Sequence, residues 1–213
     1  MSWLQGLCDP HIPKLNLDCI NRWKDLNPDW KVNILSNKTI VDYVPEYFEI
    51  IKNSPKRLPQ ACSDLVRILL LSKYGGVWVD ASVYPMKPLS DFYHDIVNES
   101  GFFSYRFIPR GSYDARKMCE TVSWFLCTNQ PNHYLIEAWK EQFIKRFKTY
   151  NEWPYFTFHE TLTFLYDNDM KIKKTINEMV EINEQIPHSA QHRWKDRIES
   201  YMYKRPVLDQ IND

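Results

Sequence analysis

The chain has 213 residues, of which 44% are hydrophobic and 25% are charged, and this composition is ordinary for a globular protein with one domain. Its 27 basic and 27 acidic residues give a formal net charge of zero. No basic surface is therefore indicated that would neutralise a phosphate backbone, and a nucleic-acid partner is excluded on this ground.

Five cysteines are odd in number and form no C-x-x-C pair, which is typical neither of a disulfide framework nor of a zinc site. The first residues lack the pattern of a signal peptide. The longest apolar run, Ile68 to Leu71, is too short to span a bilayer. These features predict a cytoplasmic protein with reduced thiols and no transmembrane segment.

Helix and strand patterns alternate along the chain, which predicts an α/β layered fold. Apolar residues at three- and four-residue spacings predict a helix over 15–26, and Pro28 prevents its continuation. Residues 30–34 alternate apolar and polar side chains, the period of a strand. A short helix is predicted over 37–44.

A strong helix is predicted over 59–74, because Pro59 suits its first turn and the glycine pair at 75–76 supplies the left-handed conformation that ends it. A buried strand follows at 77–79. Downstream, the same rules predict strands over 101–105 and 122–127 and helices over 134–150, 160–165 and 172–179.

Asp64 and Arg67 stand three residues apart and so share one face of the helix 59–74. That helix is apolar nearly all round, which predicts burial, and buried charges need partners. The two side chains either pair with each other, which gains little over apolar replacements, or bind a ligand. In the second case Asp64 accepts from ribose or sugar hydroxyls, and Arg67 donates as a fork to a sugar oxygen or a phosphate.

Asp80 lies just past the end of the predicted strand 77–79. In open α/β sheets, ligands bind outside the carboxyl ends of the strands. A carboxylate at this place suits Mg²⁺ or Mn²⁺, which take oxygen ligands and bridge phosphates. The alternative is an Asp that stabilises a turn or caps a helix.

The pattern S-D-x-x-R at 63–67, followed by G-G-x-x-x-D at 75–80, resembles the capsular-polysaccharide-synthesis and mannosyltransferase group of glycosyltransferases. It also resembles the glucosyltransferase domains of the large clostridial toxins. The chain as a whole is similar to the N-terminal domain of a chlorella-virus glycosyltransferase, which implies a viral origin. Residues 2–6 are similar to the first-strand motif of these enzymes, and residues 20–27 are similar to their first helix. The resemblance covers about residues 1–92.

This resemblance implies a GT-A-like fold, an α/β, Rossmann-related architecture with a central mixed sheet flanked by helices. It implies one glycosyltransferase domain over 1–213, in which 1–92 bind the nucleotide-sugar and 93–213 form the acceptor side and a C-terminal segment that closes over metal and donor. The implied reaction is retaining transfer of a hexose, glucose or a deoxyhexose such as rhamnose. The donor would be a UDP-sugar, the cofactor Mn²⁺ or Mg²⁺, and the acceptor a glycan or glycoprotein.

By position, Trp3 matches the ring that stacks on uracil, and Arg67 matches a sugar-contacting arginine. Asp80 matches the first acid of the metal-binding Asp-x-Asp motif, and Asp64, Arg67 and Asp80 form the implied catalytic centre. The implied nucleotide-sugar-binding set is Trp3, Ser36, Ser63, Asp64, Arg67 and Asp80.

Ser82 stands where the toxins have the second acid of that motif. A neutral hydroxyl is a poor replacement for a carboxylate on a dication, so other ligands must help. His188 is the first candidate, because residues 186–192 resemble a Pro-His segment of the capsular family and Mn²⁺ accepts imidazole beside oxygens. The implied metal set is Asp80, Ser82 and His188; a surface position in a polar loop is the alternative for His188.

His159 and Glu160 also resemble a family motif, at the start of the predicted helix 160–165. If the resemblance extends to this segment, the two residues face the acceptor. The alternative is that they cap the helix or belong to the core. Two other functions are weighed against the transferase. A nucleotide-sugar-binding module without turnover is suggested by Ser82. A glycoside hydrolase needs a facing pair of acids, and nothing in the sequence requires one.

Overall fold

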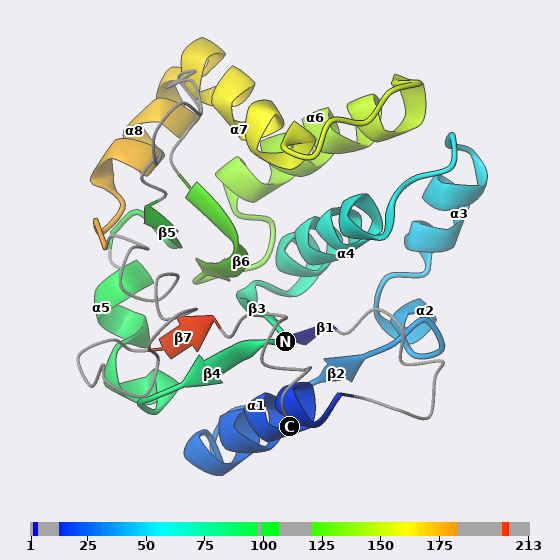
Figure 1. Cartoon of the computed structure of the whole chain (residues 1–213). Helices are drawn as coiled ribbons and strands as arrows, with labels where there is room; N and C mark the ends of the chain where they lie inside the picture. The colour runs from blue at the N-terminus through cyan, green and yellow to red at the C-terminus, as the bar shows by residue number, and fades with distance from the viewer. Residues whose placement is uncertain (1, 4–12, 98, 107–120, 183–201, 205–213) are drawn as a thin grey trace, which may run out of the picture.

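The computed structural model describes residues 2–3, 13–97, 99–106, 121–182 and 202–204 (Figure 1). A mixed five-stranded sheet runs through the molecule in the order β2-β1-β3-β6-β5. β1 is parallel to both of its neighbours, whereas β6 is antiparallel to β3 and to β5. The strands are β1 (Ser2–Trp3), β2 (Ile34–Leu35), β3 (Gly76–Asp80), β5 (Phe102–Arg106) and β6 (Thr121–Thr128).

A second sheet pairs β4 (Val83–Pro85) with β7 (Met202–Lys204) in antiparallel register. Tyr84 lies opposite Tyr203 in this register. The pairing brings the C-terminal part of the chain beside the turn that follows β3.

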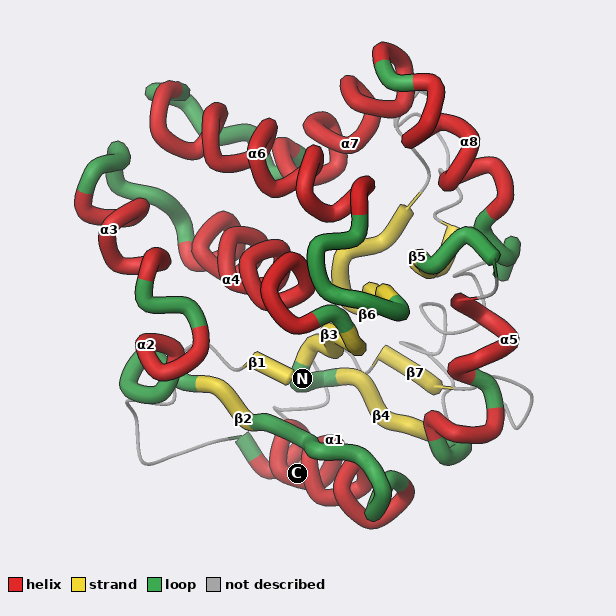
Figure 2. Tube along the Cα trace, turned by 180° about the vertical axis from the view of Figure 1, so that it is seen from behind, coloured by secondary structure: helices red, strands yellow, loops and turns green. Residues whose placement is uncertain are grey.

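Helices cover both faces of the central sheet. Figures 1 and 2, taken from opposite sides, both place α1 on one side of it and α4, α6 and α7 on the other. The helices are α1 (Lys14–Leu26), α2 (Ile40–Tyr43), α3 (Glu46–Lys52), α4 (Pro59–Tyr74), the 3₁₀ turn η1 (Leu89–Asp91), α5 (Tyr93–Val97), α6 (Tyr134–Thr149), α7 (Thr157–Asn168) and α8 (Met170–Glu178). The predicted α/β, GT-A-like central mixed sheet flanked by helices is confirmed.

Most of the core is one hydrophobic cluster that extends from Trp23 in α1 to Met202 in β7, and a small second cluster joins Ile20 to Ala81. α4 lies at the centre of the large cluster and is buried on almost every side from Ala61 to Ser72, as its apolar sequence predicts. Gly75 ends the helix at φ +62, and a Cβ added there would lie 2.7 Å from the backbone of Gln130. Only glycine fits this turn.

Several predicted boundaries are wrong for identifiable reasons. The strand expected over 30–34 is present only as β2, because the described part of β1 pairs with Ile34 and Leu35 and not with the residues before them. The helix expected over 37–44 is present only as α2 over residues 40–43, and α3 begins after Pro45, outside the predicted range. The helix expected over 160–165 begins three residues earlier.

Five further elements were not predicted. η1, α5, β4 and β7 are each three to five residues long, and α3 has seven residues. All five are too short to show a clear apolar period. None of the helices in the described ranges is long and apolar enough to cross a membrane.

Candidate functional site

Three of the predicted residues meet at the carboxyl edge of the parallel strands. Trp3 at the end of β1 is paired in register with Asp80 on one side and Leu35 on the other. Ser36 follows Leu35 directly and is half-buried. The backbone therefore places Trp3, Ser36 and Asp80 side by side at the edge where α/β sheets bind ligands.

Arg67 connects α4 to this edge. Its Nη1 lies 3.0 Å from Asp64 Oδ1, and its Nη2 lies 3.3 Å from Asp80 Oδ1. Nη2 also donates to Ser63 Oγ at 3.2 Å. The prediction that Asp64 and Arg67 lie together on a buried helix face is confirmed by the geometry, but the pair is not isolated, because the same guanidinium reaches the carboxylate that ends β3.

The guanidinium of Arg67 retains hydrogen-bonding capacity. Its Nε and Nη1 are buried and donate no hydrogen bond to a described residue; the contact of Nη1 with Asp64 is an ion pair without hydrogen-bond alignment. Buried donors of this kind are costly unless a partner satisfies them. Arg67 is therefore arranged to donate to a group that enters from the sheet edge.

Two aromatic rings hold Arg67 in place. Its Cζ lies 5.1 Å from the ring centre of Trp78 and 5.7 Å from that of Phe158 in α7, within the range of cation–π attraction. Trp78 Nε1 also donates to Asp80 Oδ1 at 3.1 Å. Neither ring was singled out from the sequence. The contact of Trp78 with Asp80 was predictable, because residues two apart on a strand share a face. No feature of the sequence predicted the contact of Phe158 with Arg67.

The three charged side chains of the cluster differ in their exposure to solvent. The side chains of Arg67 and Asp64 are 6% and 11% exposed, whereas that of Asp80 is 26% exposed. Asp80 is thus the member that a cation or ligand reaches first. Asp64 lies behind it as a buried acid.

Burial raises the pKa of Asp64 to about 7. Arg67 lowers this pKa and the nearby charge of Asp80 raises it, but neither effect outweighs desolvation. Near neutral pH, Asp64 is therefore divided between a neutral acid that can donate and a carboxylate that can only accept.

We expect Asp64→Asn to remove a pH dependence from the stability of the ligand-free protein. Because the pKa of Asp64 is higher folded than unfolded, the folded state binds more protons between pH 4 and 7, and stability falls as pH rises through that window. The loss attributable to Asp64 between pH 5 and 7 is about 2 kcal/mol. Urea unfolding at pH 5, 6, 7 and 8 measures this loss. If the unfolding free energy fell equally with pH in wild type and in Asp64→Asn, the raised pKa of Asp64 would be contradicted.

The expected metal ligands are only partly covered by the structure. Ser82 is half-buried in the turn between β3 and β4, two residues after Asp80. His188 lies outside the described residues. Within the described ranges, no group of three His, Cys, Asp or Glu side chains is arranged to hold a metal ion, so Asp80 would need a hydroxyl and ligand oxygens to complete a coordination shell.

The predicted acceptor residues lie in the first turn of α7. His159 follows Phe158, the residue over Arg67, and its ring centre is 5.8 Å from that of Phe156. Glu160 Oε2 is 3.9 Å from Arg146 Nη1 of α6. This contact makes Glu160 part of the packing between α6 and α7. His159 directly follows Phe158, whose ring contacts Arg67.

The family model described as capsular polysaccharide synthesis protein matches residues 1–210. The chain belongs to this family. The resemblance found in its sequence motifs is thereby confirmed.

Two characterised relatives share part of this capsular-family chain. An initiation-specific alpha-1,6-mannosyltransferase of Candida albicans is 28% identical over 98 residues, which are 43% of this chain and 25% of that protein. The O-glycosyltransferase braB of Annulohypoxylon truncatum is 34% identical over 89 residues, 37% of this chain and 21% of that protein. The matches span about a quarter or less of the relatives' lengths.

Two solved structures are similar to the capsular-family chain at a TM-score of 0.47 and 14% sequence identity. One is the PaToxG glycosyltransferase, with coverage of 81% of this chain and 71% of that chain. The other is a glycosyltransferase involved in the glycosylation of the major capsid of PBCV-1, with coverage of 99% and 95%. The expected viral origin and cytoplasmic location stay predictions.

Proposed function

We propose that this protein is a glycosyltransferase that takes a hexose from a UDP-sugar and transfers it to a glycan or glycoprotein acceptor. The observation that carries the proposal is the Arg67 fork, which joins a buried acid on α4 to Asp80 at the carboxyl edge of the sheet. Family membership and the names of the two relatives support the same reaction class.

In this proposal each side chain has a positioning role. Arg67 donates its unused Nε–H or Nη1–H to a sugar or phosphate oxygen, and Asp64 holds sugar hydroxyls on the buried side. Trp3 and Ser36 border the nucleotide at the ends of β1 and β2. Fixed donors and charges of this kind lower a barrier without reorganising during the reaction.

Mn²⁺ or Mg²⁺ would be held by Asp80, with the hydroxyl of Ser82 and with His188 as further ligands. One partly exposed carboxylate fits this use, because such ions are often bound by one or two carboxylates together with substrate phosphates. When bound, the ion would offset the charge that develops on the diphosphate leaving group.

The proposed transfer breaks the bond between the anomeric carbon and the diphosphate oxygen and forms a bond from that carbon to an acceptor hydroxyl oxygen. The hydroxyl proton leaves with the diphosphate. Attack on the same face as the departing group would retain the anomeric configuration. Glucose and a deoxyhexose such as rhamnose are the donor sugars to test first, and His159 is the candidate residue on the acceptor side.

Calorimetric titration with UDP, CMP and GDP, each with and without Mn²⁺, tests the donor class. We expect UDP to bind in a metal-dependent way and CMP and GDP to bind at least about tenfold more weakly. UDP-sugars would then be screened for slow hydrolysis. Absence of nucleotide binding with every metal would refute the proposal.

Trp3→Ala is expected to weaken UDP binding by about 1–3 kcal/mol, if uracil stacks on this ring as bases stack on aromatic side chains elsewhere. The same titration measures the change. Trp30→Ala is the matched control, because Trp30 precedes β2 at the opposite edge of the sheet. Equal affinities for wild type and Trp3→Ala would reduce Trp3 to a packing residue.

A nucleotide-sugar-binding module without turnover is the second candidate. It is favoured by Ser82 in place of an acid and by the engagement of Asp80 Oδ1 with both Arg67 and Trp78. Metal-dependent release of UDP from a UDP-sugar would exclude it.

A further inference from the structure

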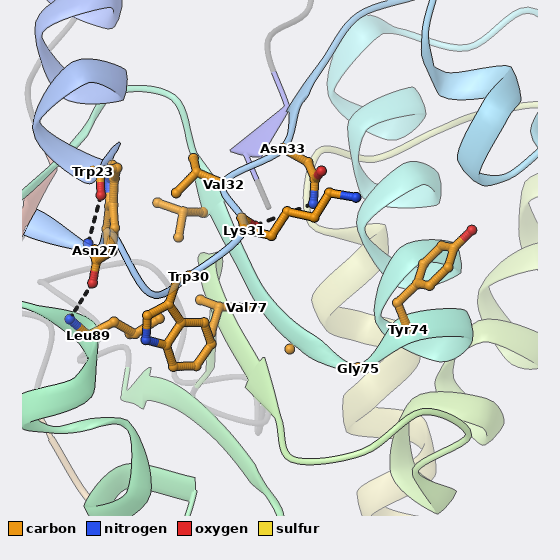
Figure 3. Close-up of a pocket in the computed structure, with 12 residues that line it drawn as sticks. Trp23, Asn27, Trp30, Lys31, Val32, Asn33, Tyr74, Gly75, Val77 and Leu89 are labelled. Atoms are coloured by element: carbon orange, nitrogen blue, oxygen red, sulfur yellow. Dashed lines mark hydrogen bonds between the residues drawn. The ribbon is translucent and has the colours of Figure 1, made fainter. Parts of the chain in front are cut away.

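The aromatic contacts of Arg67 lie on one face of the central sheet. A pocket of about 300 Å³ lies on the other face, where Figure 3 shows Trp23 and Asn27 of α1 beside Val77 of β3. Side chains alternate across a strand, so Trp78 points away from this pocket and contacts Arg67. The Arg67 cluster therefore lies on the face that α4, α6 and α7 cover in Figures 1 and 2.

Phe158 is held beside Arg67 by one residue of α6. The ring of Trp139 is stacked on the ring of Phe158, with ring centres 4.1 Å apart and an angle of 28° between the planes. Trp139 Nε1 donates to the main-chain oxygen of Phe158 and to Thr161 Oγ1, both at 3.0 Å. Both large side chains are fully buried. Trp139 thus holds the ring and the backbone of Phe158 together, and a rotation of α7 would break both contacts.

The aromatic cluster continues from Phe158 to a second arginine. The ring centre of Phe143 is 5.2 Å from that of Phe158 and 5.5 Å from that of Trp153, with the rings edge to face in both pairs. At the far end of the cluster, Arg57 Cζ lies 4.7 Å from the ring centre of Trp153. Arg57 and Arg67 therefore contact rings of the same cluster.

The two arginines use their hydrogen-bond donors differently. Arg57 donates from Nε and Nη2 to the main-chain oxygen of Phe147 and from Nη2 to that of Tyr150, so it holds the C-terminal end of α6. Arg67 has buried Nε and Nη1 atoms that donate to no described residue. Arg57 thus uses its donors within the fold, whereas Arg67 keeps donors available for a ligand.

The ionic contacts of Arg67 do not by themselves fix the plane of its guanidinium. The contact with Asp64 lacks hydrogen-bond alignment, and the contact with Asp80 is 3.3 Å long. The attraction between charges depends on their distance, whereas a closely packed ring excludes every orientation that would collide with it. The ring of Phe158 therefore restricts where the donors of Arg67 point.

We propose that Phe158 and Trp139 are positioning residues of the donor site. Phe158 restricts the Arg67 guanidinium to the orientation in which its spare N–H groups meet the donor, and Trp139 keeps Phe158 in place. Both act through Arg67. The inference rests on the proposed function, in which Arg67 donates to a sugar or phosphate oxygen.

Phe158→Leu tests the ring, and Phe147→Leu is the matched control. Both phenylalanines are fully buried in the same cluster, and Phe147 contacts Arg57 at 5.4 Å as Phe158 contacts Arg67 at 5.7 Å. The two variants should lower the melting temperature by similar amounts, about 2–8 °C. If Phe158→Leu does not fold, Phe158→Met and Phe147→Met make the same comparison, because methionine adapts to irregular core space.

The orientation of Arg67 is measured by NMR on protein with ¹⁵N-labelled arginine. Rotation about the Nε–Cζ bond exchanges the two Nη groups, and its rate reports how firmly the guanidinium plane is held. We expect this rotation in Arg67 to be about 5–30-fold faster in Phe158→Leu, the range set by a desolvated cation–π contact, and unchanged in Phe147→Leu. Trp139→Phe keeps a ring but loses the donor to Phe158, and it should accelerate the rotation by a smaller factor.

Release of UDP from the UDP-sugar that wild type hydrolyses gives the second measurement. Phe158→Leu should reduce kcat about 10–100-fold, the scale on which a misplaced group slows a reaction. KM should be nearly unchanged, because Arg67 is still present to bind and the loss falls on the transition state. Phe147→Leu should have the kcat of wild type, since its ring is packed against Arg57 instead.

The proposal requires faster rotation of Arg67 and a lower kcat together in Phe158→Leu. Either change without the other would overturn it, and so would equal values in Phe158→Leu and Phe147→Leu. If wild type releases no UDP from any UDP-sugar, the proposed function fails, and the rotation rates still decide whether Phe158 and Trp139 fix Arg67.

Discussion

Asp80→Asn is expected to reduce metal-dependent release of UDP from a UDP-sugar by at least about 100-fold, the scale on which one electrostatic contact to a transition state acts. Asn has nearly the same shape and its oxygen still accepts from Trp78 Nε1, so the fold should be retained. The lost charge is the one that would hold the cation in the proposed site. Initial rates at several Mn²⁺ concentrations measure the effect.

Asp95→Asn is the matched control for this variant, because Asp95 is exposed on α5 and lies outside the Arg67 cluster. Its rate and metal dependence should equal those of wild type. An Asp80→Asn protein with full activity and unchanged metal dependence would remove Asp80 from the proposed site.

Arg67→Ala is expected to cost about 3–5 kcal/mol of unfolding free energy at pH 7.5, the usual cost of removing one partner from a buried ion pair. Asp64 would be left in a buried position with its raised pKa and without its cation, while Asp80 can still be hydrated. Urea denaturation measures the difference. Donor binding should be lost as well, since the forked donor is absent.

The double variant Asp64→Asn/Arg67→Ala separates charge from packing. Replacing the stranded carboxyl by a neutral amide should recover a substantial part of the stability but none of the donor binding. Lys174→Ala is the control, because its pair with Glu178 joins two exposed side chains and should leave stability unchanged. A loss in Arg67→Ala no larger than in Lys174→Ala would show that the cluster does not stabilise the fold.

The parts of the fold that were predictable from sequence are those with local signals. α4 begins at Pro59 and ends before Gly75 as predicted, because proline and glycine mark helix ends through their own backbone preferences. The extent of β2 was not predictable, because a strand extends only as far as its neighbour pairs with it. β4 and β7 pair residues more than a hundred positions apart, and no local pattern reports such a contact.

The candidate site divides in the same way. Asp64, Arg67 and Asp80 belong to one helix–turn–strand unit. Their spacing predicted that Asp64 and Arg67 share a helix face, and the sheet-edge rule predicted a ligand edge at Asp80, whereas the family resemblance was needed to group all three in one centre. Phe158 comes from α7, about ninety residues further along the chain, and reaches Arg67 only through tertiary packing. His188 is outside the described residues, and its part in a metal site stays a prediction.

The pairing of β4 with β7 affects how the protein is completed during synthesis. β4 begins three residues after Asp80, yet its partner is made only when residues 202–204 leave the ribosome. Synthesis proceeds at about 5–20 residues per second, so several seconds pass in which the turn carrying Ser82 has no partner strand. A nascent chain stalled before Met202 should therefore be more sensitive to protease at this turn than the finished chain, even though α4 and β3 have already been made.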